Sequence, residues 1–177
     1  MTVLDCEKFV IRPWVQSDLD SLVLHANTEK IASQLRDRFP HPYTREAGRA
    51  WLDIATSMDP LTAFALAVNE EAVGGIGIEL KEDIARCSAE IGYWLGEEHW
   101  GKGIVTKAVI EMTRHAFETF ELTRLYALVF EENQASRRVL EKAGYTLDAI
   151  LQRNTIKAGR IHNQALYSTL RENVISE

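Results

Sequence analysis

Residues 91–106 read IGYWLGEEHWGKGIVT, and this stretch decides how the rest of the chain is interpreted. Its first five residues complete a predicted strand, and the apolar spacing from 103 to 120 predicts an amphipathic helix. A glycine-rich turn between strand and helix directs unpaired backbone N–H groups at one point, with the helix dipole behind them. We therefore expect an anion site in which Gly101 and Gly103 admit a phosphate and Lys102 adds a charge.

Two common nucleotide-binding motifs fit this turn incompletely. Residues 96–102 match seven positions of the pattern GxxxxGK[ST], but Gly103 stands where a hydroxyl must bind magnesium. Glu97 and Glu98 would also repel phosphate inside such a loop. The dinucleotide pattern GxGxxG fails because Thr106 takes its third glycine position. A tight strand-to-helix connection without any ligand remains the simplest competing interpretation.

A second motif follows the predicted strand at 125–130. Residues 133–145 read NQASRRVLEKAGY, which resembles the N-x-x-S-x-R-V-L-E-K-A-G-F/Y segment of the RimJ/RimL-like branch of the GNAT superfamily of N-acetyltransferases. Residues 100–105 resemble the acyl-CoA loop of that superfamily, Q/R-x-x-G-x-G/A, with Trp100 and Val105 as departures typical of the branch. The beginning of the chain, at 11–18, and its end, at 159–171, resemble the same branch.

The resemblance implies one GNAT domain over residues 1–177, of the α/β (α+β) class. Its sheet is mixed and twisted, with central parallel strands at 88–95 and 125–130 that splay apart and with flanking helices. Periodicity and turn residues predict strands at 9–14, 63–68, 72–80, 88–95, 125–130, 145–152 and 164–170, and helices at 17–27, 44–58, 103–120 and 134–143. Residues 28–43 are expected to be irregular. Ser17 and Thr44 are the expected N-caps, with Ala47, Trp51 and Ile54 facing inward on the second helix.

Composition fits this interpretation. The chain has 177 residues, of which 46% are hydrophobic and 26% charged, as in a single globular domain. The net charge of -6 disfavours nucleic acid and anionic membrane surfaces as partners. No stretch approaches the ~20 apolar residues of a membrane span, and the first nine residues do not form a signal peptide, so we expect a cytoplasmic protein. The cysteines and histidines show no metal-binding spacing, and no metal is expected.

By resemblance, the chain binds acetyl-CoA as the acetyl donor. The backbone at 91–95 would pair with pantetheine amides, the amides at 101–106 would hold the diphosphate, and Asn133 would reach the pantetheine. A role as the N-cap of the following helix would by itself explain an asparagine at position 133. The predicted binding residues are Ile91, Tyr93, Trp94, Leu95, Trp100, Gly101, Lys102, Gly103, Ile104, Val105, Thr106, Asn133 and Ser136.

Acetyl transfer requires a base for the amine, stabilisation of an oxyanion and a proton for the thiolate. Many members carry a tyrosine acid seven residues after the asparagine, where this chain has Leu140. In the resembled branch the serine at position 136 takes that role. Glu90, on the strand lining the splay, is the candidate base, acting through water. We expect Glu90→Gln to lower turnover at least tenfold at neutral pH. A polar helix residue and a solvent-facing carboxylate are the alternatives for Ser136 and Glu90.

The expected function is acetyl-CoA-dependent transfer to a primary amine by direct attack, on a small molecule or a peptide. The acceptor stays open between a protein N-terminus, an antibiotic, a polyamine and an amino acid. Asn163 occupies a position that is often Asp in relatives, so the acceptor does not transfer by resemblance. A non-catalytic CoA-binding regulatory protein is the alternative, because the tyrosine acid is missing. A homodimer is the habit of the family, although no residue demonstrates it.

Overall fold

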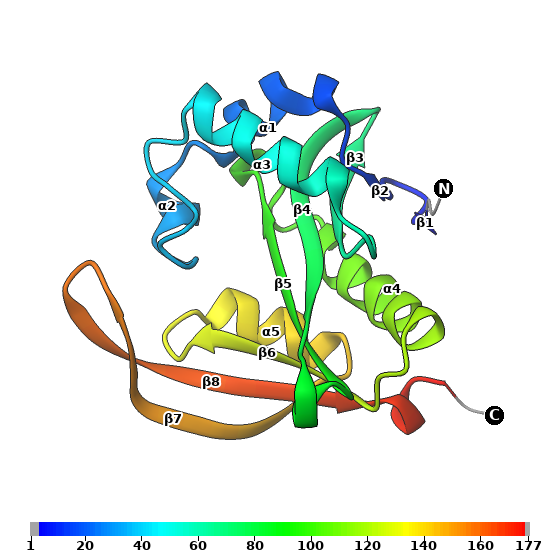
Figure 1. Ribbon diagram of the computed structural model, residues 1–177. Coiled ribbons are helices and arrows are strands. Elements are labelled where there is room, and N and C mark those ends of the chain that lie inside the picture. Colours follow the sequence, from blue (N-terminus) through cyan, green and yellow to red (C-terminus); the bar gives the residue numbers. More distant parts are fainter. Residues whose placement is uncertain (1–3, 176–177) are drawn as a thin grey trace. The chain divides into compact units, whose positions relative to one another are not determined.

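The computed structural model describes residues 4–175 (Figure 1). Their contacts form two compact units. Unit 1 contains the described residues up to Gly77 together with Tyr93–Ala108, and unit 2 contains Ile78–Gly92 and the described residues from Val109 onward. The helices are α1 (Leu19–Ala26), α2 (Glu29–Ala32), α3 (Arg45–Ser57), α4 (Ile104–Thr119) and α5 (Gln134–Lys142). The strands are β1 (Leu4–Asp5), β2 (Val10–Pro13), β3 (Ala63–Val68), β4 (Glu71–Leu80), β5 (Ser88–Leu95), β6 (Arg124–Phe130), β7 (Thr146–Lys157) and β8 (Arg160–Leu170).

The strands form one mixed sheet in the order β1-β2-β3-β4-β5-β6-β8-β7. β5 and β6 pair in parallel, as the resemblance implied for 88–95 and 125–130, while β6–β8 and β7–β8 pair antiparallel. The parallel register runs from Ser88–Arg124 to Glu90–Tyr126, the first three residues of each strand. Such short pairing is typical of two strands that separate, as the predicted fold class requires. None of the helices among residues 4–175 has the length and apolar character needed to cross a bilayer.

The core of unit 1 lies between its helices and its strands. Its buried members are Trp14, Leu22, Ala26, Tyr43, Leu52, Ala55, Ala65 and Ala72. Thr44 caps α3 as predicted, because its hydroxyl accepts a bond of 3.2 Å from the N–H of Ala47. The prediction for Ile54 was wrong, since it is 54% exposed. Gly48, Leu52 and Ala55 are buried instead, so the buried stripe of α3 is rotated from the expected one.

Two further expectations for unit 1 need correction. Ser17 does not begin α1. A 3-10 turn, Gln16–Asp18, precedes the helix, and the carboxylate of Asp18 accepts a 3.0 Å bond from the N–H of Val15. The segment 28–43 is not wholly irregular, because it contains α2, a single four-residue turn. Sequence periodicity cannot reveal so short an element, since it requires at least two turns to show.

The glycines of β4 allow close approach of a neighbouring backbone. A Cβ atom on Gly74 would lie 2.5 Å from the carbonyl oxygen of Trp94, and one on Gly75 would lie 2.7 Å from Nε1 of the same residue. The register of β3 and β4 shifts between Leu66 and Ala67, which leaves Val73 without a partner on β3. This is a bulge, and it frees the carbonyl of Val73 to accept a bond of 2.8 Å from Gly96.

In unit 2, Thr113 of α4 bonds the hydroxyl of Tyr145 at 2.8 Å, and Arg137 of α5 bonds Tyr167 of β8 at 3.1 Å. The predicted face of α4 is buried, with Val109, Met112, Ala116 and Phe117 fully inaccessible. α5 ends in a Schellman motif, in which Gly144 (φ +86°) and Tyr145 donate to the carbonyls of Glu141 and Leu140. β7 and β8 are longer than predicted. They form an extended hairpin joined at Gly159 (φ +74°) (Figure 1). Residues 153–163 are mostly polar, so their sequence did not show the apolar alternation that predicts a strand.

The close approach at Gly74 makes a stability prediction. Gly74→Ala is expected to lower the free energy of unfolding by about 1 to 3 kcal/mol, because the added methyl must displace a backbone carbonyl rather than a flexible side chain. Urea denaturation measures the change. Gly92→Ala is the matched control, since a Cβ there meets no atom within 4 Å. Equal stability of both variants would show that the strand has room at Gly74.

Candidate functional site

The turn before α4 has the backbone of an anion site. Gly101 (φ +73°) and Gly103 (φ +78°) both lie in the left-handed region, which favours glycine. A Cβ on either would meet no atom within 4 Å, so the space beside them is open. The carbonyl of Gly103 accepts from the N–H of Lys107 at 3.1 Å, which makes Gly103 the residue that begins the helix. The N–H groups of Ile104, Val105 and Thr106 therefore have no acceptor within the helix.

Contacts within unit 1 hold this turn in place. The indole N–H of Trp100 donates to the carbonyl of Leu95 at 2.7 Å, across the base of the turn. The N–H of Gly96 donates to Val73, and Glu97 forms an ion pair with Lys30. Trp100 replaces the Gln or Arg of the resembled motif, and here its polar atom fastens the turn to the end of β5. Lys102 is exposed, as a residue that meets a solvent-borne anion must be.

A histidine pair lies under the turn. His25, which is buried, contacts Oε1 of Glu71 through Nε2 at 2.9 Å, and its ring stands edge-on to that of His99 at 5.5 Å. Gly96 leaves room for this ring, since a Cβ there would lie 2.8 Å from Nδ1 of His25. Burial lowers the pKa of His99, and the charges of Lys102 and His25 lower it further. The pKa of His99, beside the predicted anion site, therefore lies below the ordinary histidine value.

In unit 2, Glu90 belongs to an ion-pair cluster. Nζ of Lys81 lies 2.6 Å from a carboxylate oxygen of Glu79 and 3.4 Å from one of Glu90. It also lies 5.8 Å from the ring centre of Tyr126. Burial alone would lower the pKa of Lys81, but the bond to Glu79 and the charges of Glu79, Tyr126 and Glu90 outweigh burial and raise it. The candidate base is thus already engaged by an ammonium group.

Asn133 and Ser136 lie together at the start of α5, also in unit 2. Oδ1 of Asn133 accepts a bond of 3.1 Å from the backbone N–H of Ser136, so the capping interpretation of Asn133 is confirmed. Arg137, the next residue, donates through Nε to the hydroxyl of Tyr167 at 3.1 Å, and that hydroxyl donates to Glu141 at 2.7 Å. Tyr167 is fully buried and fixes α5 to β8.

Sequence reasoning missed a set of contacts beside these residues. In the turn from β6 to α5, Glu131 contacts Asn163 and Glu132 contacts His162, both on β8. The partners are about thirty residues apart, and no spacing rule joins them. Only the antiparallel register of β6 and β8, which pairs Phe130 with Gln164, brings them together. Among the described residues, no cluster of three His, Cys, Asp or Glu side chains suited to a metal is present.

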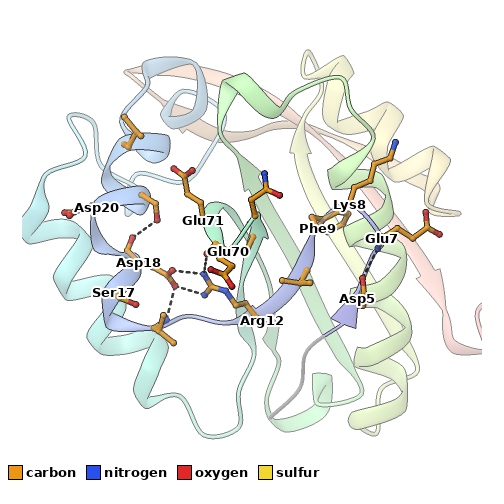
Figure 2. Close-up of a pocket in the computed structure, with 16 residues that line it drawn as sticks. Asp5, Glu7, Lys8, Phe9, Arg12, Ser17, Asp18, Asp20, Glu70 and Glu71 are labelled. Carbon is orange, nitrogen blue, oxygen red and sulfur yellow. Dashed lines mark hydrogen bonds and ion pairs between the residues drawn. The ribbon is translucent and has the colours of Figure 1, made fainter.

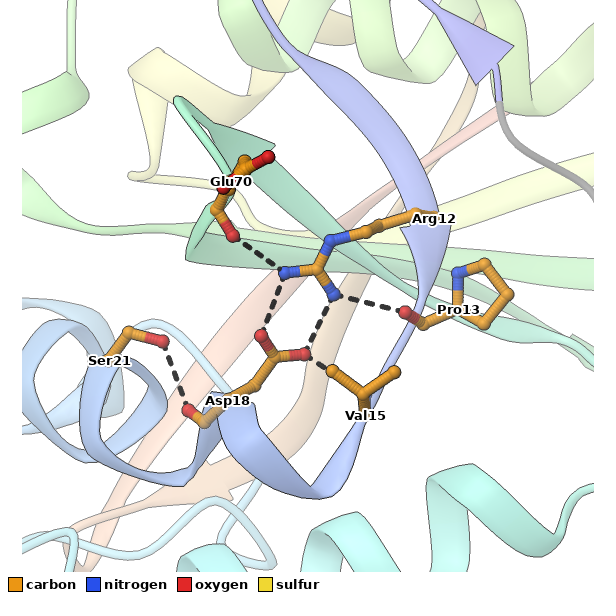
Figure 3. A network of polar contacts seen from close by, with 6 residues as sticks. All are labelled: Arg12, Pro13, Val15, Asp18, Ser21 and Glu70. Atoms are coloured by element: carbon orange, nitrogen blue, oxygen red, sulfur yellow. Dashed lines mark hydrogen bonds and ion pairs between the residues drawn. The ribbon is translucent and has the colours of Figure 1, made fainter.

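A separate cavity of about 940 Å³ lies in unit 1 (Figure 2). None of its lining residues was predicted to bind or catalyse. Arg12 is one of the lining residues. Its guanidinium donates to both carboxylate oxygens of Asp18 at 2.8 and 2.7 Å and to the carbonyl of Glu70 at 3.0 Å (Figure 3). The bonds to Asp18 raise the pKa of Arg12. The resemblance at 11–18 therefore reflects a structural ion pair rather than a reacting group.

The lowered pKa of His99 predicts a pH effect on stability. The unfolded chain takes up a proton near the ordinary histidine value of about 6.5, whereas folded His99 takes it up only at lower pH. Stability is therefore complete above that value and falls as the pH drops toward the folded pKa. His99→Gln is expected to reduce this loss, as measured by urea midpoints at pH 7.5 and 5.5. An identical loss in both proteins would assign the effect to other groups, such as His115, whose pKa burial also lowers.

Comparison with known proteins agrees with this geometry. The family described as Acetyltransferase (GNAT) domain matches residues 8–146. YoaA of Bacillus subtilis (strain 168), named as an uncharacterised N-acetyltransferase, is 30% identical over 102 residues, which are 58% of this chain and 57% of YoaA. The ribosomal-protein-serine acetyltransferase of Escherichia coli (strain K12) is 32% identical over 89 residues, 50% of this chain and 49% of that protein. The chain thus spans about half to three fifths of these relatives.

Solved structures share the fold over almost the whole chain. RimL, a ribosomal L7/L12 alpha-N-protein acetyltransferase in complex with coenzyme A, superposes with a TM-score of 0.83 over 96% of this chain and 98% of RimL, at 20% identity. The predicted resemblance is confirmed by the family match, which extends over more than half of the chain. With its eight-stranded mixed sheet and its glycine turn before α4, this chain belongs to the GNAT acetyltransferase family.

Proposed function

We propose that this protein binds acetyl-CoA and transfers the acetyl group to a primary amine by direct attack. The observation that carries the proposal is the turn at 101–106. Two glycines with positive φ, open space beside them and the unpaired amides at the start of a 16-residue helix form a site for an anionic diphosphate. The exposed ammonium of Lys102 adds attraction. These groups fit the most charged part of acetyl-CoA.

The remaining binding residues follow from strand chemistry. The backbone of Ile91, Tyr93, Trp94 and Leu95 would pair with the pantetheine amides as a neighbouring strand does. The parallel register of β5 with β6 ends at Glu90 and so does not include these residues. Asn133 uses Oδ1 as a helix cap, and an amide side chain retains two N–H donors for a ligand carbonyl.

Ser136 is the proposed proton donor to the departing thiolate. It lies in the first turn of α5, where the helix dipole favours developing negative charge. Leu140 replaces the tyrosine found at this place in many family members, so a hydroxyl three residues after Asn133 is the available donor on this helix face. Acetyl transfer then proceeds without a covalent enzyme intermediate, and neither cysteine is required.

The proposed acceptor class is a peptide or small-molecule primary amine. One relative is named a ribosomal-protein-serine acetyltransferase and a fold neighbour a ribosomal L7/L12 alpha-N-protein acetyltransferase, which favours a peptide N-terminus as the first probe. The net charge of -6 favours a cationic acceptor. A regulator that binds CoA without turnover would bind the donor equally well, and an acetyl-transfer assay with peptide, spermidine and amino-acid probes separates the two.

Gly103→Asp tests the diphosphate site. The carboxylate would stand at the start of α4 and repel the diphosphate, so acetyl-CoA affinity measured by isothermal titration should fall at least about 100-fold. Gly159→Asp is the matched control. Gly159 also has positive φ and open surroundings, which gives it the same backbone strain at the far hairpin turn. Unchanged affinity in Gly103→Asp, or equal loss in both variants, would place the donor site elsewhere.

A further inference from the structure

The turn from β6 to α5 is tied residue by residue to its surroundings in unit 2. The N–H of Glu131 donates to the carbonyl of Asn163 at 3.0 Å, and its carboxylate accepts from the Asn163 amide at 2.8 Å. Oε1 of Glu132 lies 2.5 Å from Nδ1 of His162. Asn133 caps the helix that carries Ser136. His162 therefore contacts Glu132, the residue that directly precedes Asn133, the predicted pantetheine-binding residue.

The contact with Glu132 fixes the tautomer of His162. An ionised carboxylate only accepts hydrogen bonds, so Nδ1 must carry the proton and donate it. The other ring nitrogen, Nε2, is then the one with a lone pair. This is the arrangement in which a carboxylate orients an imidazole base and stabilises the imidazolium that forms. The ring also packs on Phe130, with centroids 5.1 Å apart, which restricts its rotation.

The ring remains within reach of a ligand. The His162 side chain is 24% exposed, in contrast to the fully buried Tyr167 on the same strand. Charged groups on the neighbouring segments are Glu131 and Glu132 in the turn, four on α5 (Arg137, Arg138, Glu141 and Lys142) and three on β7 (Asp148, Arg153 and Lys157). The carboxylate of Glu131 is held by Asn163. Glu132 thus contacts the ring directly and is the nearest charge to it among the described contacts.

We propose that His162, positioned by Glu132, is the general base that deprotonates the acceptor amine, an inference that rests on the proposed function. It assigns the role to a residue other than Glu90, which sequence reasoning favoured. The carboxylate of Glu90 is engaged by Lys81 within a cluster that also contains Glu79. His162, by contrast, contacts through Nδ1 the residue that directly precedes Asn133, and its side chain is 24% exposed.

The proton balance is simple. Nε2 of His162 takes one proton from the ammonium, and the neutral amine nitrogen then forms a bond to the thioester carbon. The C–S bond breaks as the tetrahedral centre collapses. Ser136 donates its proton to the sulfur and regains one from the acylated nitrogen, and His162 finally releases its proton to solvent. The products are an amide, CoA thiol and one proton, with no oxidant or further co-reactant.

The test is a pH–rate profile of acetyl transfer, followed by thiol release, with a peptide bearing a free N-terminal serine, spermidine and an amino acid as probes. His162→Asn retains a donor toward Glu132 but removes Nε2, and Glu132→Gln removes the orienting charge at constant size. Glu90→Gln tests the rival base. His115→Asn is the matched control, since this histidine bonds Thr119 on α4 and has no part in the proposal. Isothermal titration with acetyl-CoA accompanies each variant.

His162→Asn should lower kcat about 100-fold at neutral pH, with acetyl-CoA affinity changed less than about twofold. The deficit should shrink as the pH rises through the pKa of the probe amine, because solvent then removes the proton. Glu132→Gln should give a smaller loss with the same recovery, and His115→Asn should keep the wild-type profile.

A loss that is equal at every pH would indicate a structural role and overturn the proposal, as would wild-type turnover in His162→Asn. A pH-dependent loss in Glu90→Gln instead would return the base role to Glu90. If wild-type protein acetylates none of the probes, the proposed function fails, and the base assignment fails with it. If wild-type protein is active, only the base assignment is in question.

Discussion

The left-handed backbone at Gly101 and Gly103 is the constraint on which the rest of the structure depends. It turns the chain from β5 into α4 within a few residues and leaves the first amides of the helix without internal acceptors. Much of unit 1 is built to hold that turn. The β4 bulge frees the carbonyl of Val73 for Gly96, and the indole of Trp100 fastens the turn to Leu95. Small residues in β4 and at Gly96 provide the space that these contacts need.

In unit 2, the turn from β6 to α5 is also held by contacts from neighbouring elements. Asn133 begins α5 and the Schellman motif at Gly144 ends it, so the helix that presents Ser136 is defined at both ends. Tyr167, Asn163 and His162 all lie on β8 and bind the turn or the helix from one side. In this way one long strand supplies a rigid support for a short helix and for the polar groups in front of it. Catalytic groups placed on such supported elements retain their geometry better than groups on loops.

The sequence predicted the fold well where local rules and tertiary structure agree. The glycine turn, the amphipathic helix α4 and the cap at Thr44 were expected from spacing and propensity, and the parallel β5–β6 pair was expected from the family resemblance. It failed where packing decided between similar patterns. Ile54 fits the apolar pattern of its helix but is solvent-exposed. Asp18, rather than Ser17, is the residue that precedes α1, and its carboxylate is bonded to Arg12 on β2. The contact between Glu132 and His162 depends on strand register, which no linear spacing reveals.

The central claim is that the turn at 101–106 binds the diphosphate of acetyl-CoA. The most direct measurement is isothermal titration of the wild-type protein with acetyl-CoA, followed by the same titration with ATP. The account predicts micromolar affinity for acetyl-CoA and no heat of binding with ATP, because the turn has Gly103 where a nucleotide loop needs a hydroxyl for magnesium. Absence of acetyl-CoA binding, or binding of ATP in its place, would contradict the account.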